Sequence, residues 1–307
     1  MSKLQNSPYT VGNDAAYLRW REEKLASYPE SVSELRVEIE NPQNLSAEEH
    51  QALLAKCRKT NMVVYADRSA DATAGKNMLR SLGRQLGLQH LDPNMLADDD
   101  GITSLEVIPG KLKRGYIPYS DRRLLWHTDG YYNSGDRQIR AMLLHCVRPA
   151  AEGGENALLD PEIAYLLLRD REPRYIEALM SDDVMTIPAN VEAGAVERPA
   201  QSGPVFSISQ ADGSLHMRYT ARTRSIEWKN DVLVREAVAA LEELLGSHST
   251  YIFRYTLQAG EGLLCNNVLH NRAAFSSDAG EQAGRLLYRA RYYDRIAGTS
   301  LANEDYE

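Results

Sequence analysis

The run His127-Thr128-Asp129, taken together with His270, is the set of side chains in this sequence best suited to bind a metal ion. Two imidazoles and one carboxylate form the ligand set that binds a mononuclear iron(II) ion through one face of its coordination sphere. Here two of the three side chains are close in sequence and the third lies far downstream. That arrangement leaves positions open for further ligands and O2. A His-x-Asp pair is common by chance, so the assignment depends on its context.

The spacing of the candidate ligands favours a shared site. His127 and Asp129 are two residues apart, and on a strand both side chains would point to the same face. His270 is the best third ligand, because it follows an apolar strand at 262–265 and two asparagines. His216, beside a hairpin, is the one real competitor. On spacing alone, a three-ligand site and a surface His-x-Asp pair both stay open.

The remaining four histidines suit other environments. His145 lies inside an apolar run, which predicts a hydrogen-bonded core histidine, and His248 lies between two serines after a helix, which predicts a solvated turn. His50 and His90 have no candidate partner nearby in sequence. We therefore do not expect these four to bind metal.

Composition excludes several classes of protein. The chain has 307 residues, 43% hydrophobic and 25% charged, which is ordinary for a globular protein. A net charge of -8 argues against a nucleic-acid surface. No run of 18 apolar residues and no signal peptide are evident, so we expect neither a membrane span nor export. Three widely spaced cysteines suit a reducing compartment. These features predict a soluble cytoplasmic protein.

Four helices are predicted from capping and periodicity. Ser46 and Glu49 form a capping box at the start of a helix over 47–58. A second helix is predicted over 72–86, ended by Gly87. Asp160 can cap a third over 161–170, and a fourth is predicted over 231–246.

Many short strands are predicted from residue 104 onward. Asp212-Gly213, between two apolar runs, is a strong hairpin signal. Many strands with a few covering helices indicate a mixed α/β protein with a mainly β core, closed or double-sheeted, and a single domain over 1–307. The predicted strands are 62–65, 105–108, 140–147, 184–187, 205–209, 215–219, 251–257, 262–265 and 286–293.

Four blocks, in this order and spacing, resemble the taurine dioxygenase (TauD/TfdA-like) family of Fe(II)- and 2-oxoglutarate-dependent oxygenases. They are Trp-His-Thr-Asp at 126–129, Gly-Gly-Glu-Asn at 153–156, Asn-Val-Leu-His-Asn-Arg-Ala-Ala-Phe at 267–275 and Arg-Leu-Leu-Tyr-Arg at 285–289. The resemblance covers about 123–295. It implies a double-stranded β-helix (jelly roll, cupin-like) core over 104–307 with helical insertions, after a helix–strand–helix opening over 1–103. It also implies that His127, Asp129 and His270 bind the iron.

The resemblance also implies a binding site for the cosubstrate. 2-Oxoglutarate carries a carboxylate at its far end, and a guanidinium group can bind it through two hydrogen bonds. Arg285 corresponds to the family's arginine for this purpose, although it could instead cap a strand end on the surface. Asn156 departs from the family, which often has a threonine whose hydroxyl helps to hold the carboxylate. The Asn156 amide can still donate a hydrogen bond.

Candidate substrate-binding residues lie near both blocks. Arg289 is four residues beyond Arg285 and would share its face in a strand. The matching arginine of the taurine enzymes grips the sulfonate of the substrate, but Arg289 could instead support the iron site through hydrogen bonds. Tyr131, Tyr132 and Asn133 directly follow the metal motif and are expected to overhang the pocket.

The expected activity is therefore a dioxygenase that hydroxylates or desaturates a small organic substrate, using O2 and releasing succinate and CO2. Relatives that halogenate lack the carboxylate ligand, so Asp129 argues against halogenation. The expected partner is an anionic or amino-acid-like small molecule, and the family's tendency allows a homo-oligomer. Two alternatives stay open: a mononuclear-metal cupin-type enzyme that does not use 2-oxoglutarate, and a non-catalytic metal-binding relative.

Overall fold

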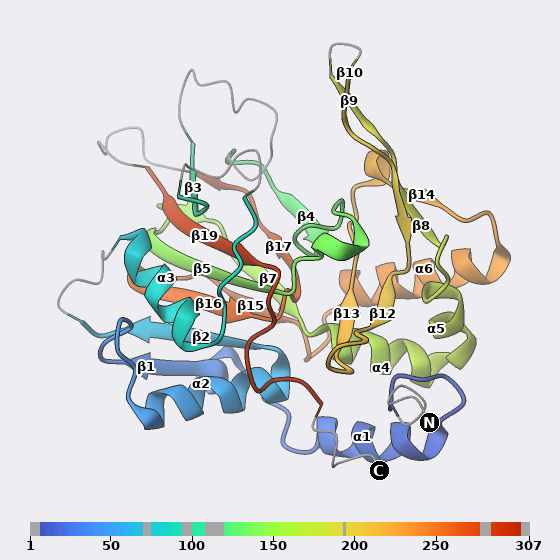
Figure 1. Cartoon of the computed structure of the whole chain (residues 1–307), viewed down its shortest axis with the longest axis horizontal. Helices are drawn as coiled ribbons and strands as arrows, with labels where there is room; N and C mark the ends of the chain where they lie inside the picture. Colours follow the sequence, from blue (N-terminus) through green and yellow to red (C-terminus); the bar gives the residue numbers. More distant parts are fainter. Residues whose placement is uncertain are drawn as a thin grey trace.

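Two β-sheets form the centre of the molecule (Figure 1). The computed structural model describes residues 7–69, 75–93, 100–107, 120–192, 195–276 and 284–301. The larger sheet has the order β1 (Arg36–Ile39), β2 (Met62–Asp67), β16 (Glu261–Cys265), β5 (Ala141–Arg148), β19 (Leu286–Tyr292) and β3 (Thr103–Glu106). The smaller sheet has the order β15 (Phe253–Tyr255), β7 (Asn156–Leu159), β17 (Leu269–Arg272) and β4 (Leu124–His127). All neighbours pair antiparallel except β1 and β2.

Both faces of the larger sheet are buried, and the alternation of side chains along β5 shows how. Met142, Leu144 and Cys146 pack into the core between the two sheets, together with side chains of β7 and β17. Ala141 and Leu143 point to the other face and join a second core beneath helices. A strand buried on both faces reads as a continuous apolar run, as β5 does.

Helices cover the sheets on two sides. α2 (Ala47–Thr60) and α3 (Lys76–Gln85) pack on the outer face of the larger sheet. α4 (Pro161–Arg171), α5 (Pro173–Leu179) and α6 (Val232–Gly246) pack against one another on the right of Figure 1, and α1 (Asp14–Leu25) lies at the bottom. The Tyr17 hydroxyl donates to Asp170, which ties α1 to α4 with a bond of 2.6 Å.

Short strands and 3-10 turns complete the described part of the chain. β8 (Met185–Ile187) pairs with β11 (Gln201–Gly203) and β14 (Glu227–Trp228), and the hairpin of β9 (Asn190–Glu192) and β10 (Ala195–Arg198) extends beyond it. β12 (Phe206–Ile208) pairs with β13 (Leu215–Met217), and β6 (Glu152–Gly153) with β18 (Phe275–Ser276). The 3-10 turns are η1 (Val32–Leu35), η3 (Gly135–Arg137) and η4 (Thr223–Ser225).

The jelly-roll fold class and the strongest local predictions are confirmed. The capping box of Ser46 and Glu49 starts α2, and Asp160 caps α4. Gly213, with φ of +69°, lies in the connection between β12 and β13, as the hairpin signal predicted. Residues 72–74 of the second predicted helix and Ile108 of a predicted strand lie outside the described residues.

Several elements were not predicted. α1, α5, β1, β4, β7 and β17 had no prediction of their own. The opening over 1–103 also supplies strands to the core, because β1 and β2 extend the larger sheet.

Cys57, Cys146 and Cys265 are free and buried. Among the described residues, no helix has both the length and the apolar character to cross a bilayer.

Candidate metal and anion site

His127 and His270 lie directly opposite each other on the adjacent strands β4 and β17. Opposed residues of an antiparallel pair project to the same face, so the two rings meet with centroids 4.2 Å apart. One candidate ligand atom from each of His127, Asp129 and His270 lies within 4.8 Å of the others. This is the one such three-residue group in the described part of the chain, and His216 is not in it.

Both imidazoles are oriented by a backbone carbonyl two residues earlier in the chain. Nδ1 of His127 lies 2.9 Å from the Leu125 carbonyl, and Nδ1 of His270 lies 2.9 Å from the Val268 carbonyl. A carbonyl oxygen can only accept, so each Nδ1 carries the hydrogen and each Nε2 keeps a lone pair for a metal.

Burial keeps both rings neutral. It lowers the pKa of His127 to about 3, with a further contribution from His270. Burial also lowers the pKa of His270, against the opposing effect of Asp129. Neutral imidazole is the form that binds a metal ion, so protons do not compete for these two ligands near neutral pH.

The Asp129 carboxylate reaches the site from a turn, which corrects the prediction that it shares a strand with His127. β4 ends at His127, and the chain turns at Gly130, where φ is +68°. A Cβ atom at Gly130 would lie 2.4 Å from Cγ1 of Ile139. Only glycine combines this backbone conformation with so close a contact, so the turn directs Asp129 toward the histidines.

Asn267 fixes the backbone of Asp129. Its Oδ1 accepts from the Asp129 amide at 2.8 Å, and its Nδ2 donates to the carbonyls of Asp129 at 2.9 Å and Ile139 at 2.7 Å. Asn267 itself has φ of +51°, a left-handed conformation that asparagine tolerates better than most residues. The segment before His270 and the turn after His127 are thereby tied together.

One oxygen of the Asp129 carboxylate is paired and the other is not. Oδ1 accepts from Nη1 of Arg289 at 3.2 Å and lies 3.9 Å from Nη1 of Arg291. Burial raises the pKa of Asp129, but the charges of Arg289 and Arg291 outweigh it and hold that pKa well below its usual range. Oδ2 is buried with no hydrogen-bond partner in the described structure. A bound cation would satisfy this oxygen, which otherwise costs about 1–3 kcal/mol.

The three predicted substrate residues beyond Gly130 have different surroundings. The Tyr131 ring lies 6.5 Å from that of His127, edge to face. The Tyr132 hydroxyl accepts from Nη1 of Arg291 at 3.1 Å. Asn133 donates through its side chain to the Arg137 carbonyl at 2.8 Å, within its own turn. Tyr131 thus contacts a candidate metal ligand directly, while Asn133 stabilises the turn.

Arg291 was not predicted as a site residue. Its guanidinium binds Asp92, whose other oxygen accepts from the Tyr293 hydroxyl at 2.7 Å. The Asp92 amide also donates to the Arg291 carbonyl at 2.8 Å. Burial acts against the charge of Arg291, but Tyr132, Asp129 and Asp92 raise its pKa overall. The alternation of β19 could have indicated Arg291, because it shares a face with Leu287 and Arg289.

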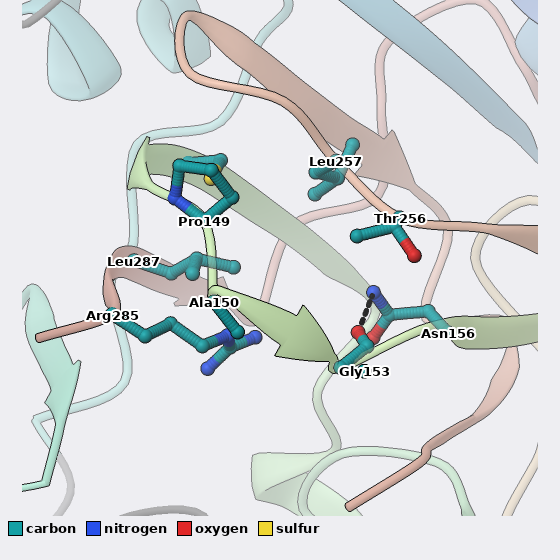
Figure 2. A pocket seen from close by; sticks show the side chains of 10 residues that line it. Pro149, Ala150, Gly153, Asn156, Thr256, Leu257, Arg285 and Leu287 are labelled. Carbon is teal, nitrogen blue, oxygen red and sulfur yellow. Dashed lines mark hydrogen bonds between the residues drawn. The ribbon is translucent and has the colours of Figure 1, made fainter. Parts of the chain in front are cut away.

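Arg285 lies in a pocket whose lining does not include the three candidate ligands. The pocket is lined by Cys146, Gly154, Asn156, Thr256, Arg285 and Leu287, among others (Figure 2). Arg285 is only 7% exposed, so the alternative of a surface strand cap is wrong. Burial lowers its pKa to about 10, and within the described residues no carboxylate forms an ion pair with it. A buried guanidinium without a counter-charge is electrostatically suited to an anionic ligand.

A second buried arginine strengthens the positive potential of this pocket. Arg272 and Arg285 each lie with the guanidinium carbon 4.8 Å from the centre of the Phe275 ring. Burial, and then the charge of Arg285, lower the pKa of Arg272 to about 10. Nη2 of Arg272 donates to the carbonyls of Ser120 and Arg122 at 2.7 and 2.6 Å, so it holds the chain that leads into β4.

The other histidines lie outside the site. His145 is buried, and its Nδ1 lies 3.1 Å from the Tyr65 hydroxyl, which confirms a hydrogen-bonded core histidine. His248 is exposed, as predicted. His90 pairs with Asp294 at 2.8 Å, and His50 lies 3.1 Å from the Gln85 carbonyl.

Comparison with known sequences gives a family match over most of the chain. A family model described as "Taurine catabolism dioxygenase TauD, TfdA family" matches residues 23–291. A uridine-5'-phosphate dioxygenase of a Streptomyces species is 31% identical over 174 residues, covering 54% of this chain and 60% of that protein. One of an Amycolatopsis species is 30% identical over 126 residues, covering 36% and 44%. The chain thus spans about half the length of the curated relatives it matches.

Solved structures with the same fold are more distant in sequence. The non-heme iron oxygenase OrfP, solved with Fe, succinate and (3S)-hydroxy-L-Arg, has a TM-score of 0.60 and 16% identity over 81% of each chain. Asparagine oxygenase, solved with Fe(II), 3-hydroxyasparagine and succinate, has a TM-score of 0.56 and 14% identity. It covers 82% of this chain and 85% of that chain. These matches support the fold.

Proposed function

Because the chain belongs to the taurine catabolism dioxygenase TauD, TfdA family, we propose that it is an Fe(II)- and 2-oxoglutarate-dependent dioxygenase whose iron is bound by His127, Asp129 and His270. The observation that carries this proposal is the set of free donor atoms. Two neutral imidazoles with available Nε2 atoms and one carboxylate with an unpaired, buried oxygen meet in one place. Two histidines and a carboxylate are the ligands of iron(II) oxygenases that keep positions open for cosubstrate and O2.

When bound, iron(II) with 2-oxoglutarate and O2 supplies the oxidation that splits the keto acid into succinate and CO2 and hydroxylates or desaturates the substrate. The protein contributes orientation and exclusion of water. The Leu125 and Val268 carbonyls hold the imidazoles, and Arg289 holds one oxygen of Asp129. Tyr131 packs edge to face beside His127.

Arg285 is proposed to bind the distal carboxylate of 2-oxoglutarate. Its buried guanidinium has no acidic partner within the described residues, and β19, which begins directly after it, carries Arg289 beside the metal ligands. Asn156, in the same pocket, is proposed to contact the cosubstrate. Arg289 is proposed to position Asp129 rather than to bind the substrate, because its guanidinium already contacts that carboxylate.

The substrate is proposed to be a small anionic molecule, with a nucleoside phosphate as the class to test first. The support is sequence similarity to two uridine-5'-phosphate dioxygenases at 30% and 31% identity. An amino acid is the second class of substrate, since two structural neighbours were solved in complex with hydroxylated asparagine and hydroxylated arginine. Tyr131 and Tyr132 are proposed to flank the substrate, and Asn133 to shape their turn.

Anaerobic spectroscopy tests the proposed iron chemistry. Addition of Fe(II) and then 2-oxoglutarate to the wild-type chain should give a weak visible charge-transfer band. Asp129→Ala should lose it, while the matched control His216→Ala should keep it. No band, and no succinate formed from 2-oxoglutarate in air, would defeat the proposal. If His216→Ala removed iron binding and His270→Ala did not, the ligand assignment would be wrong.

A further inference from the structure

Position 156 is where this chain departs from the family it belongs to, because it has asparagine where a threonine hydroxyl often helps to hold 2-oxoglutarate. The Asn156 side chain lies in the pocket of Arg285, and its Nδ2 makes one long contact of 3.5 Å to the Gly154 carbonyl. An amide is longer than a hydroxyl and has a different donor geometry. The pocket therefore lacks the hydroxyl at its usual position.

A threonine, Thr256, nevertheless lines the same pocket, just after a different strand. Thr256 directly follows β15, whose last residue, Tyr255, is the register partner of Asn156 on β7. Figure 2 shows the Thr256 and Asn156 side chains on one side of the pocket and Arg285 on the other. Thr256 and Asn156 are 100 positions apart in sequence, yet the pairing of β15 with β7 makes them neighbours in space.

The backbone around Thr256 is fixed without using its hydroxyl. The buried Glu261 accepts from the Tyr255 hydroxyl at 2.8 Å and from the Gln258 amide at 3.0 Å. The Gln258 side chain donates to the Thr256 carbonyl at 2.9 Å. Within the described residues, the Thr256 hydroxyl itself has no hydrogen-bond partner. It is therefore held in place with a donor still to be used.

We propose that Thr256 is a cosubstrate-binding residue of this chain: its hydroxyl donates to the distal carboxylate of 2-oxoglutarate, across the pocket from Arg285. The hydroxyl that the family often supplies from position 156 is thus supplied by position 256. This inference rests on the proposed function of the site. It goes beyond it by assigning a residue that lies in none of the four sequence blocks.

The chemistry of the pocket favours this assignment. A carboxylate bound by one guanidinium has lone pairs left over, and a hydroxyl on the opposite side can donate to one of them. In the described structure, no acidic side chain competes with the ligand for the positive charge of Arg285. Leu257 and Leu287 close the apolar part of the pocket, which strengthens a hydrogen bond to a charged group.

A binding titration tests the proposal without reference to turnover. 2-Oxoglutarate is titrated anaerobically into the Fe(II)-loaded full-length chain, and the dissociation constant is read from the charge-transfer band. Calorimetry on the Mn(II)-loaded chain gives a second, independent value. Thr256→Val removes the hydroxyl at nearly constant shape and should weaken binding about tenfold, the loss expected for one hydrogen bond to a charged group. Thr256→Ser keeps the hydroxyl and should bind within about threefold of wild type.

Two further comparisons separate a lost hydrogen bond from lost packing. Asn156→Thr restores the family's residue, so in Thr256→Val it should recover most of the lost affinity. 2-Oxopentanoate lacks the distal carboxylate, so Thr256→Val should bind it as the wild-type chain does. Thermal unfolding and iron binding of each variant show that the fold is intact.

The outcomes distinguish this inference from the proposed function. If the wild-type chain binds 2-oxoglutarate and Thr256→Val binds it equally well, the role of Thr256 is wrong and the function stands. If Thr256→Ser binds as weakly as Thr256→Val, the hydroxyl is not the cause and the role is again wrong. A wild-type chain that gives no band and no heat with 2-oxoglutarate overturns the proposed function and this inference together.

Discussion

The two ends of the candidate site are built in opposite ways. At the metal end, His127, Asp129 and His270 are each held by a second contact, so their positions are set before any ligand arrives. At the anchor end, Arg285 is buried and has no ion pair within the described residues. The metal end is therefore ordered by internal hydrogen bonds, whereas the anchor end has an unpaired charge that is available to an external anion.

The largest expected effect is the loss of a metal ligand. His270→Ala should weaken Fe(II) binding more than about a hundredfold, since loss of a mere supporting group already costs 10–100-fold. Equilibrium dialysis or a competitive chelator measures the affinity. His50→Ala, which changes a histidine far from the site, is the matched control. Unchanged iron affinity in His270→Ala would remove the basis for treating this end as a metal site.

The second largest effect is expected from removing the positive charge of Arg285 at the anchor end. Arg285→Gln should weaken 2-oxoglutarate binding about a hundredfold, because two hydrogen bonds to a carboxylate lose their charge. Iron affinity should stay within about threefold, since no metal ligand contacts Arg285 in the described structure. Arg254→Gln, at an exposed position of β15, serves as the control. A large change in iron affinity in Arg285→Gln would break the distinction between the two ends.

A smaller effect is expected from the group that positions the carboxylate. Arg289→Gln should weaken Fe(II) binding about tenfold, because Asp129 Oδ1 loses its charged partner at 3.2 Å. If Arg289 instead gripped the substrate, the variant would keep its iron affinity and raise the KM for the substrate. The two measurements together decide between these roles.

The smallest effect concerns His216, which lies outside both ends. Burial, with the charges of Arg140, Arg295 and Arg218, lowers its pKa to about 3. An unfolded histidine titrates at about 6.5, so below that pH the unfolded chain binds the extra proton and folding stability falls toward acid. His216→Gln should flatten this dependence by on the order of 1 kcal/mol between about pH 6.5 and about pH 5.5. Chemical denaturation of the metal-free chain at the two pH values measures it. An unchanged slope would mean that His216 titrates normally.

Elements that carry local signals in the sequence were predictable, and elements that lack such signals were not. The start of α2 was predictable because Ser46 and Glu49 cap it through their own side chains. β7 and β17 are only four residues each, and their pairing partners are distant in sequence, so no periodicity reveals them. The turn after β4 brings Gly130 close to Ile139, a contact that no local sequence pattern contains.

The candidate site follows the same rule. His127, Asp129, His270 and Arg285 could be proposed from the sequence because their order and spacing resemble a family. Thr256 could not, since it reaches the pocket through the pairing of β15 with β7. The alternation of β19 could have indicated Arg291, but not its contacts with Asp92 and Tyr132.

The histidine-to-carbonyl bonds also bear on how such a centre can be inherited or transplanted. Each imidazole is oriented by a carbonyl two residues earlier in the chain, so a segment of three residues carries both the histidine and its orienting group. Asp129 depends on Arg289, 160 positions away, and on Asn267, 138 positions away. Transfer of the segments 125–127 and 268–270 to another barrel would therefore keep each imidazole with its orienting carbonyl. The contacts that hold Asp129 would have to be built anew.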